Sequence, residues 1–364
     1  MDKLSQVWNR IQQTLFPHLE ETLDPLTKKQ RSLAAILELV RIEDFIINER
    51  GWRGRPRKDR KALARAFVAK AVYNLTTTRA LIDYLQSSAN LRRLCGWERK
   101  YDVPHEALFS RAFAEFASTE LPRRVHDALI VKYCSDRIVG HISRDSTAIH
   151  AREKPERRPN KKSLPRPKRK PGRRRKGEAP RPKPPTRLQL QRKMTIDEMI
   201  EDLPTVCDIG RKDLGKGRAE HWAGYKLHVD WADGGIPISS LLTSASLHDC
   251  QVAIPLAEMT ARNVTSLYDL MDSAYDAKEI REHSLEMGHV PIIDYNRRRV
   301  QKIEMDPATA KRYEERTMAE RGFSRLKDGL GGRNVRVRGP TKVMAHLMFG
   351  LLVIAAEQLL RLVA

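Results

Sequence analysis

Four residues in the last sixth of the sequence combine a hydroxyl, a carboxylate and two cations at helical offsets. Tyr313, Arg316, Glu320 and Lys327 lie at positions 0, +3, +7 and +14. At about 100° per residue they fall within roughly 60° of one another, so on a regular helix they form one stripe. A solvated helix face with ion pairs is the alternative explanation for such charges. One carboxylate flanked by cations indicates instead a site for a metal ion and phosphate groups.

Two further carboxylates, Asp145 and Asp272, stand where strands are expected to end. The segment "RIVGHISRDSTAI" predicts a strand that ends near Asp145, and "VTSLYDLMD" predicts another with Asp272 at its tip. Ligand sites in open α/β sheets gather at such ends. Carboxylates there bind Mg²⁺, and two such ions about 4 Å apart assist phosphodiester displacement. Asp145, Asp272 and Glu320 therefore predict a catalytic site for two Mg²⁺ ions, with Mn²⁺ as a substitute; three unrelated surface acids are the alternative.

The elements that must position these residues form two regions. Residues 1–125 carry apolar side chains at helical spacing, which predicts a helical domain of helix-turn-helix type. From Asp145 onward the expected order is strand, long insert, hairpin, helix, strand, helix, strand, helix, helix. The hairpin signal is "DGG", residues 233–235, between two β-rich runs.

The composition indicates a polyanionic partner. The net charge is +22 and the pI is near 10.0, which favours nucleic acid. Residues 151–187 alone contain 17 Lys or Arg, three Glu and nine Pro, a surplus of 14 positive charges. Such a segment cannot bury a core, so we expect residues 151–193 to be a disordered insert that contacts phosphates or acts as a bare linker.

A second basic stretch, "RGWRGRPRKDRK", lies ahead of a predicted helix. Arg53 and Arg55 in it are candidates for insertion into an A·T-rich minor groove, where a narrow width attracts arginine. A basic turn that merely precedes the helix is the alternative, and it is the commoner of the two.

Cysteine spacing and hydropathy point to the cytoplasm. The four cysteines are scattered without a C-x-x-C pair, which argues against a zinc ribbon and favours a reducing compartment. The first residues show no secretory signal pattern. The apolar run "VMAHLMFGLLVIAAEQLLRL" is interrupted by charges and predicts a buried helix rather than a membrane span.

Several of these stretches together resemble one family. The spacing Tyr313-x₂-Arg316-x₃-Glu320-x₆-Lys327 resembles the Y-R-E-K signature of DDE-type transposases of bacterial insertion sequences, in the fourth and fifth families. "MDSAYDAKEI" resembles their second-aspartate motif and "RDSTAI" their first. The segments "GRPRKD" and "VPHEALFSRAFAEF" are similar to the N-terminal domain common in the fifth family.

The resemblance implies an α/β fold: an RNase H-like catalytic domain with a mixed five-stranded sheet and flanking helices, after an all-helical N-terminal domain. Its parts would be residues 126–150 and 194–364. It also implies a D-D-E triad of Asp145, Asp272 and Glu320 that cuts double-stranded DNA at terminal inverted repeats and joins the 3′-hydroxyl ends to target DNA. Tyr313, Arg316 and Lys327 would bind DNA. The protein would act as a homodimer, near the bacterial nucleoid and away from membranes.

Some assignments stay open. Lys226 in "GYKLH" is a DNA-contact candidate, or simply an exposed strand lysine. His248 and Asp249 resemble a metal-binding pair, but we expect them to cap the helix that follows. Three other classes compete with the transposase: an inactive transposase-derived DNA-binding protein, a basic structural binder of ribosomal type, and a restriction-type nuclease. Metal-dependent cutting separates the transposase from the two binding proteins.

Overall fold

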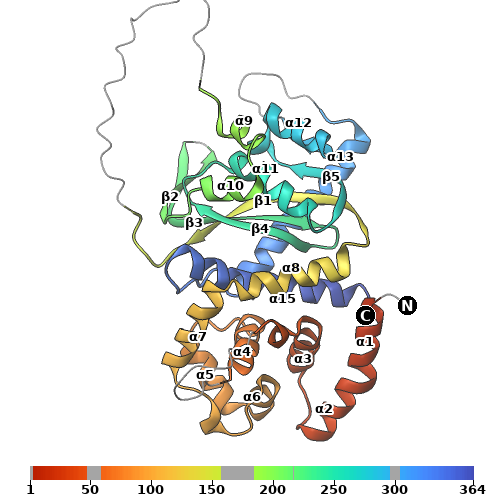
Figure 1. Cartoon of the computed structure of the whole chain (residues 1–364), viewed down its shortest axis with the longest axis vertical. Helices are drawn as coiled ribbons and strands as arrows, with labels where there is room; N and C mark the ends of the chain where they lie inside the picture. Colours follow the sequence, from red (N-terminus) through yellow and green to blue (C-terminus); the bar gives the residue numbers. More distant parts are fainter. Residues whose placement is uncertain (1–2, 47–58, 157–183, 216, 296–303) are drawn as a thin grey trace, which may run out of the picture.

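The computed structural model describes residues 3–46, 59–156, 184–215, 217–295 and 304–364. Arg53 and Arg55 lie outside these ranges, so their expected DNA contact is not addressed by the structure. Figure 1 shows a sheet-containing half above a helical half, with two long helices between them.

The helical half confirms the expectation for the first 125 residues. Caps explain several of the helix starts: Thr27 caps α3 in a capping box with Gln30, and Thr77 caps α5 by accepting from the amide of Ala80 at 3.0 Å. The last of these helices runs past residue 125, so the proposed boundary at 125/126 falls inside it. The helices are α1 (Lys3–Arg10), α2 (Phe16–Thr22), α3 (Lys28–Val40), α4 (Arg60–Val72), α5 (Thr78–Ser87), α6 (Ala89–Cys95), α7 (Glu106–Ser118) and α8 (Leu121–Cys134).

The sheet has six described strands in five positions. Its order is β2-β3-β1-β5-β6, with β4 also paired to β3. Tyr225 of β3 faces Ile149 of β1 on one side and Ser244 of β4 on the other, so β2 and β4 share the outer position beside β3. The expected five-stranded mixed sheet is therefore present with one position divided between two strands. The strands are β1 (Ile138–His150), β2 (Asp208–Gly215), β3 (Arg218–Ala232), β4 (Ile236–Ser244), β5 (Thr265–Met271) and β6 (Val290–Ile293).

Two local expectations about this half differ in outcome. The β3–β4 turn contains Gly234 and Gly235 at φ +78° and +74°, which confirms the hairpin, because glycine adopts these angles without steric strain. Strand β1 does not end near Asp145. It continues to His150, because its second half pairs antiparallel with β3 while its first half pairs parallel with β5.

The helices of this half lie on both faces of the sheet. Helix α11 (Ala253–Ala261) packs on β3 and β4, whereas α14 (Thr317–Ser324) packs on β3 and β1. The side chains of consecutive β3 residues separate the faces: Asp230 bonds Thr260 of α11, and Trp231 meets Phe323 of α14. Helices α9 (Arg187–Gln191), α10 (Ile196–Asp202), α12 (Lys278–Glu286) and α13 (Pro307–Tyr313) complete the unit.

Helix α9 lies within residues 151–193, the segment that the composition predicts to be disordered. Its Leu188 is buried, in an apolar cluster with Met199, Ile254 and Met271. A capping box from Thr186 starts the helix. The C-terminal end of the insert is therefore folded, because Leu188 adds an apolar side chain to the core.

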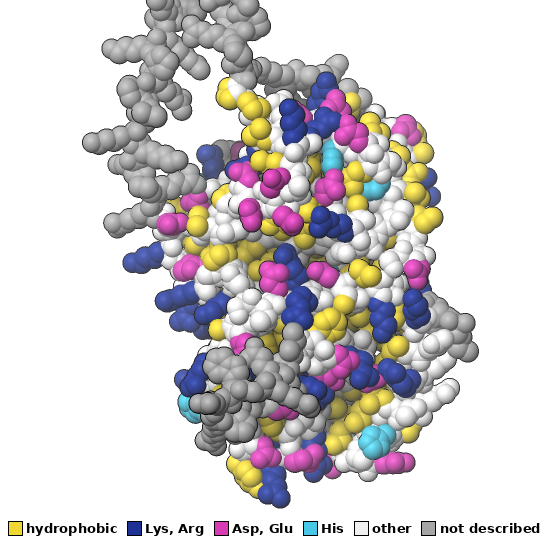
Figure 2. Space-filling view, viewed as in Figure 1, with side chains coloured by type: hydrophobic (Ala, Val, Ile, Leu, Met, Phe, Trp, Pro, Cys, Tyr) yellow, Lys and Arg dark blue, Asp and Glu magenta, His cyan; other side chains and the backbone are white. Residues whose placement is uncertain are grey.

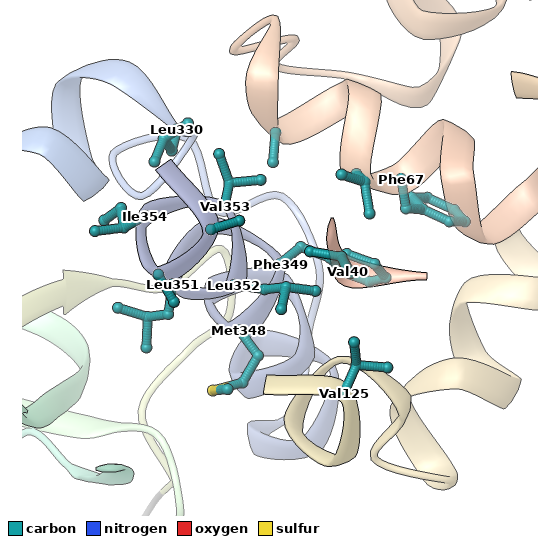
Figure 3. Close-up of a cluster of buried hydrophobic side chains, with 14 of the residues drawn as sticks. Val40, Phe67, Val125, Leu330, Met348, Phe349, Leu351, Leu352, Val353 and Ile354 are labelled. Carbon is teal, nitrogen blue, oxygen red and sulfur yellow. The ribbon is translucent and has the colours of Figure 1, made fainter. Parts of the chain in front are cut away.

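Helix α15 (Pro340–Arg361) joins the two halves. By length and composition it could cross a membrane, but 78% of its most apolar window is buried in the protein, as expected for a core helix. It packs on α8, α4, α7 and α3 of the helical half and on β4 of the sheet. Figure 3 shows Phe349 near Phe67 and Val40 on one side of α15, with Leu351 and Ile354 on the other. The two halves thus share one hydrophobic core.

Candidate active site

Asp145 and Asp272 lie side by side on neighbouring parallel strands. The register pairs Arg144 of β1 with Met271 of β5, so the next residues along the two strands are the two aspartates. Neighbouring strands lie about 4.8 Å apart, and residues in register point to the same face. Asp272 directly follows β5 and caps a short 3₁₀ helix, η5 (Ser273–Tyr275), by accepting from the amide of Ala274 at 2.9 Å. The topology therefore brings together two of the three predicted acids.

Arg316 connects the third acid to this pair. Its Nη1 lies 3.3 Å from Asp145 Oδ2 and its Nη2 lies 3.5 Å from Glu320 Oε1. Asp145 is 19% exposed in its side chain, whereas Glu320 is 64% exposed. The guanidinium thus stands between a half-buried carboxylate and a solvated one. The three acids do not form a preformed cluster, and within the described ranges no group of three or more His, Cys, Asp or Glu has metal-site geometry.

The helix that carries Glu320 is held closely against the sheet. Ser143 Oγ of β1 donates to the carbonyl of Arg316 at 3.1 Å, and Gly322 lies on the ring of Trp231. A Cβ at position 322 would lie 2.5 Å from that ring, a distance at which atoms overlap. Glycine at this position therefore allows α14 to bring Glu320 towards the strands.

The predicted stripe is interrupted in the structure. Between Pro307 and Gly329 the chain runs through α13, a 3₁₀ turn η6 (Glu314–Arg316), α14 and a π-helical turn η7 (Arg325–Gly329). These changes of pitch break the 100° rotation on which the stripe depended. Tyr313 stays beside Arg316, whose guanidinium lies 5.9 Å from its ring centre. The charged neighbours of Lys327 are instead Arg333, Lys212, Asp328 and Glu220, so Lys327 is directed towards the β2–β3 end of the molecule.

Lys226 is engaged inside the protein rather than displayed on an open strand. Its Nζ lies 2.9 Å from Asp249 Oδ1 and donates to the carbonyl of Leu247 at 2.8 Å, and its side chain is 14% exposed. The alternative of an exposed strand lysine is therefore wrong, while a DNA contact of Lys226 stays a prediction. Its ion pair holds a carboxylate near the candidate site.

Asp249 is the residue that the sequence reasoning set aside. His248 does act as an N-cap, for the 3₁₀ helix η4 (Asp249–Val252). Asp249 instead lies close enough to Asp145 and Asp272 to raise the pKa of both carboxyls. It is thus a fourth acid beside the site, and the His248–Asp249 pair was the signal that could have found it.

Burial raises the pKa of two of the acids, whereas neighbouring basic groups lower the pKa of a third. It raises the pKa of Asp145 to about 6, although the Ser146 amide and Arg316 oppose the shift. It also raises the pKa of Asp272. Asp249 is buried too, but His228 and Lys226 outweigh the burial and lower its pKa. A buried carboxylate with a raised pKa and another acid alongside is a typical binding site for a divalent cation.

The donor set fits Mg²⁺ or Mn²⁺ in chemistry. Asp145, Asp272, Glu320 and the nearby Asp249 offer carboxylate oxygens, the ligands that hard divalent cations prefer. Asp145 and Asp272 are positioned as neighbours, and among the described residues the carboxylate of Glu320 pairs only with Arg316. A bound cation would neutralise the carboxylates of Asp145 and Glu320, which the guanidinium of Arg316 neutralises in this structure.

We therefore expect Arg316→Gln to tighten Mn²⁺ binding several-fold and to weaken DNA binding. The substitution removes a positive charge 3.3 Å from Asp145, which repels a cation there, and it removes a donor for phosphate oxygens. Titration calorimetry with Mn²⁺ and a DNA-binding assay in EDTA measure the two effects. Arg321→Gln, on the adjoining helix α14 and bonded to Thr317, is the matched control. Weaker Mn²⁺ binding in the Arg316 variant would contradict this account.

The fold and the acids together define a class. A mixed sheet with β1 between β3 and β5, aspartates on β1 and after β5, and a glutamate on a later helix over the same sheet is an RNase H-like domain of the DDE type. The family comparison agrees: the Transposase DDE domain family matches residues 140–355, more than half of the chain, and the protein belongs to that family. A second family, Transposase domain (DUF772), matches residues 18–115 in the helical half. No match was found among the curated proteins.

These matches confirm the transposase class and the RNase H-like fold that the sequence predicted. DNA is accordingly the partner on which such proteins act. The narrower resemblance to the fourth and fifth insertion-sequence families stays a prediction.

Proposed function

We propose that this transposase cuts DNA at the ends of an insertion sequence and joins the freed 3′-hydroxyl ends to target DNA. The observation that carries the proposal is the placement of Asp145 and Asp272 as neighbours on β1 and β5, with Glu320 linked to Asp145 through Arg316. The family match supports DNA breakage and joining in general. The assignment of the chemistry to these three residues is ours.

In this proposal each residue has a distinct task. Asp145, Asp272 and Glu320 hold Mg²⁺, for which Mn²⁺ substitutes, and two such ions would activate the attacking oxygen and stabilise the leaving one. Arg316 and Tyr313 orient the phosphate next to the bond that is cut. Asp249, fixed by Lys226, adds negative charge beside the aspartate pair and so favours cation binding. We expect two copies to act together, one on each end, in the cytoplasm.

Cleavage of a supercoiled plasmid that carries the element ends tests the proposal. The wild-type protein should cut at the ends with Mg²⁺ and not with EDTA. Glu320→Gln should bind the ends normally and fail to cut, because the amide is a weaker metal ligand than the carboxylate. Glu314→Gln, exposed six residues earlier, is the matched control and should cut normally.

Two results would change the assignment. Normal cutting by Glu320→Gln would remove Glu320 from the site. Tight binding of the correct ends without metal-dependent cutting by the wild type would instead favour an inactive transposase-derived DNA-binding protein.

A further inference from the structure

A cavity of about 470 Å³ lies at the junction of the helical half and the C-terminal region, and none of its lining residues belongs to the candidate active site. Its wall is formed by α4, α5 and α7, by residues 330–338, by α15 and by Arg152 after β1. Both transposase family matches therefore contribute to it. A ligand here would contact the two matched regions at once.

The ionisable side chains that line this cavity are all basic among the described residues. They are Lys70, Arg152, Arg336, Arg338, Lys342 and His346. The face in view in Figure 2 differs from this cavity, since Lys and Arg are mixed there with Asp and Glu. Burial lowers the pKa of His346 to about 4, so the positive charge comes from the other five groups. With no acid in this concave wall, they create a positive potential that selects an anion.

Several of these cations lack a protein partner within the ranges that the structure describes. The side chains of Lys70, Arg152, Arg336 and Lys342 make no hydrogen bond or ion pair there. Burial and the charge of Arg336 lower the pKa of Lys70 to about 8. Glu153, next to Arg152, is already occupied by the hydroxyl of Tyr225 and the amide of Gly339. The cations thus repel one another with no acid between them, and a bound anion would relieve that repulsion.

The wall also supplies what an organic phosphate needs besides charge. Phe67, Phe113 and Phe349 pack together beneath it, with ring centres 5.1 to 6.3 Å apart, and Thr78 and Ser110 add hydroxyls. Cavities of roughly 300–1,000 Å³ hold small ligands, so this one has room for a nucleotide and not for a duplex. Cations combined with an apolar wall are typical of single-stranded nucleic-acid sites.

We propose that this cavity is a phosphate-binding site that holds an unpaired nucleotide of the DNA on which the transposase acts. The inference rests on DNA being the partner and is independent of the chemistry at Asp145. The site would add affinity for DNA that carries a single-stranded end, through contacts from both matched regions.

Binding in EDTA, where cutting is absent, tests the site separately from catalysis. The probes are a blunt duplex and the same duplex with a short single-stranded overhang. The wild type should prefer the overhang by about tenfold at 0.1 M salt, and Lys70→Met with Arg336→Gln should abolish that preference and lower the salt slope by about 1 to 2. The control is Lys132→Met with Arg262→Gln, two exposed cations outside the cavity, which should keep the preference.

Three outcomes would overturn the proposal. The first is an equal loss of the overhang preference in both double variants, which would show a general effect of the removed charge. The second is a wild type without preference for the overhang. The third is a wild type whose melting temperature rises with deoxyadenosine monophosphate but which shows no preference for the overhang. If the variant Lys70→Met with Arg336→Gln lacked that rise, the cavity would be assigned to a free nucleotide. Unchanged melting temperatures of the ligand-free variants would exclude misfolding as the cause.

Discussion

Asp145→Asn is expected to abolish metal-dependent cutting and, at the same time, to stabilise the metal-free protein at pH 8. The buried carboxyl of Asp145 has a pKa of about 6 against an ordinary value of 3.8. Such a shift corresponds to at most about 3 kcal/mol of folding free energy, since one pKa unit is worth about 1.4 kcal/mol. The net shift already includes the opposing effect of Arg316, and we expect a gain of about 1–3 kcal/mol.

The sign of the pH dependence follows from the direction of the shift. The folded state binds the Asp145 proton more tightly than the unfolded chain does, so this group costs no stability below about pH 4. Stability is lost as the pH rises towards 6, and the full cost remains above it. The variant has no proton to lose, so its advantage should be present at pH 8 and absent near pH 4.

Urea unfolding in EDTA at pH 8 and pH 4 measures this effect. Asp83→Asn, an exposed aspartate on α5, is the control and should change the free energy of unfolding little at either pH. An Asp145 variant that is less stable at pH 8 would show that the contact with Arg316 outweighs the burial. Retained cutting in that variant would refute its proposed role.

Arg144→Met should be among the most destabilising substitutions, by about 3–5 kcal/mol, because it leaves a buried carboxylate without its partner. Arg144 is 1% exposed and its guanidinium bonds both carboxylate oxygens of Asp230, at 2.9 and 2.7 Å. Asp230 is fully buried and also accepts from Thr260 Oγ1 at 2.7 Å. The pair lies one residue from Asp145, on the opposite face of β1.

A double variant separates the lost pair from a packing defect. Arg144→Met with Asp230→Asn removes both charges and keeps an acceptor for Thr260, so it should recover at least half of the lost free energy of unfolding. The measurement is urea unfolding of both variants against wild type. Equal instability in the single and double variants would mean that the methionine does not fit the space of Arg144.

The sequence predicted the parts of this fold that depend on local chemistry. The β3–β4 turn needs positive φ at Gly234 and Gly235, which the glycines predict. The apolar residues before Asp272 predict the strand there. The neighbouring positions of Asp145 and Asp272 follow from the parallel pairing of β1 with β5, although only Asp272 lies at the end of its strand. The turn and the strand needed no knowledge of long-range packing.

Other features depended on contacts that a linear pattern does not contain. Strand β1 extends beyond Asp145 because a distant strand pairs with it, and the pairing of Lys226 with Asp249 joins two segments of the chain. The prediction of a stripe from Tyr313 to Lys327 assumed a uniform helix. The 3₁₀ and π turns change the pitch, and Lys327 lies towards the β2–β3 end of the molecule. An offset along a sequence predicts a shared face only when the helix keeps its pitch.

Helix α15 also constrains how such proteins can diverge. The two family matches look like exchangeable modules, since they cover separate stretches of sequence. Yet Phe349 packs on Phe67 with ring centres 5.7 Å apart, while Met348 of the same helix contacts Ser240 of β4. A recombinant that takes its helical half from one relative and its sheet from another would inherit a mismatched surface on at least one side of this helix. A successful exchange would require coordinated changes along both sides of α15, so the two halves should evolve together rather than independently.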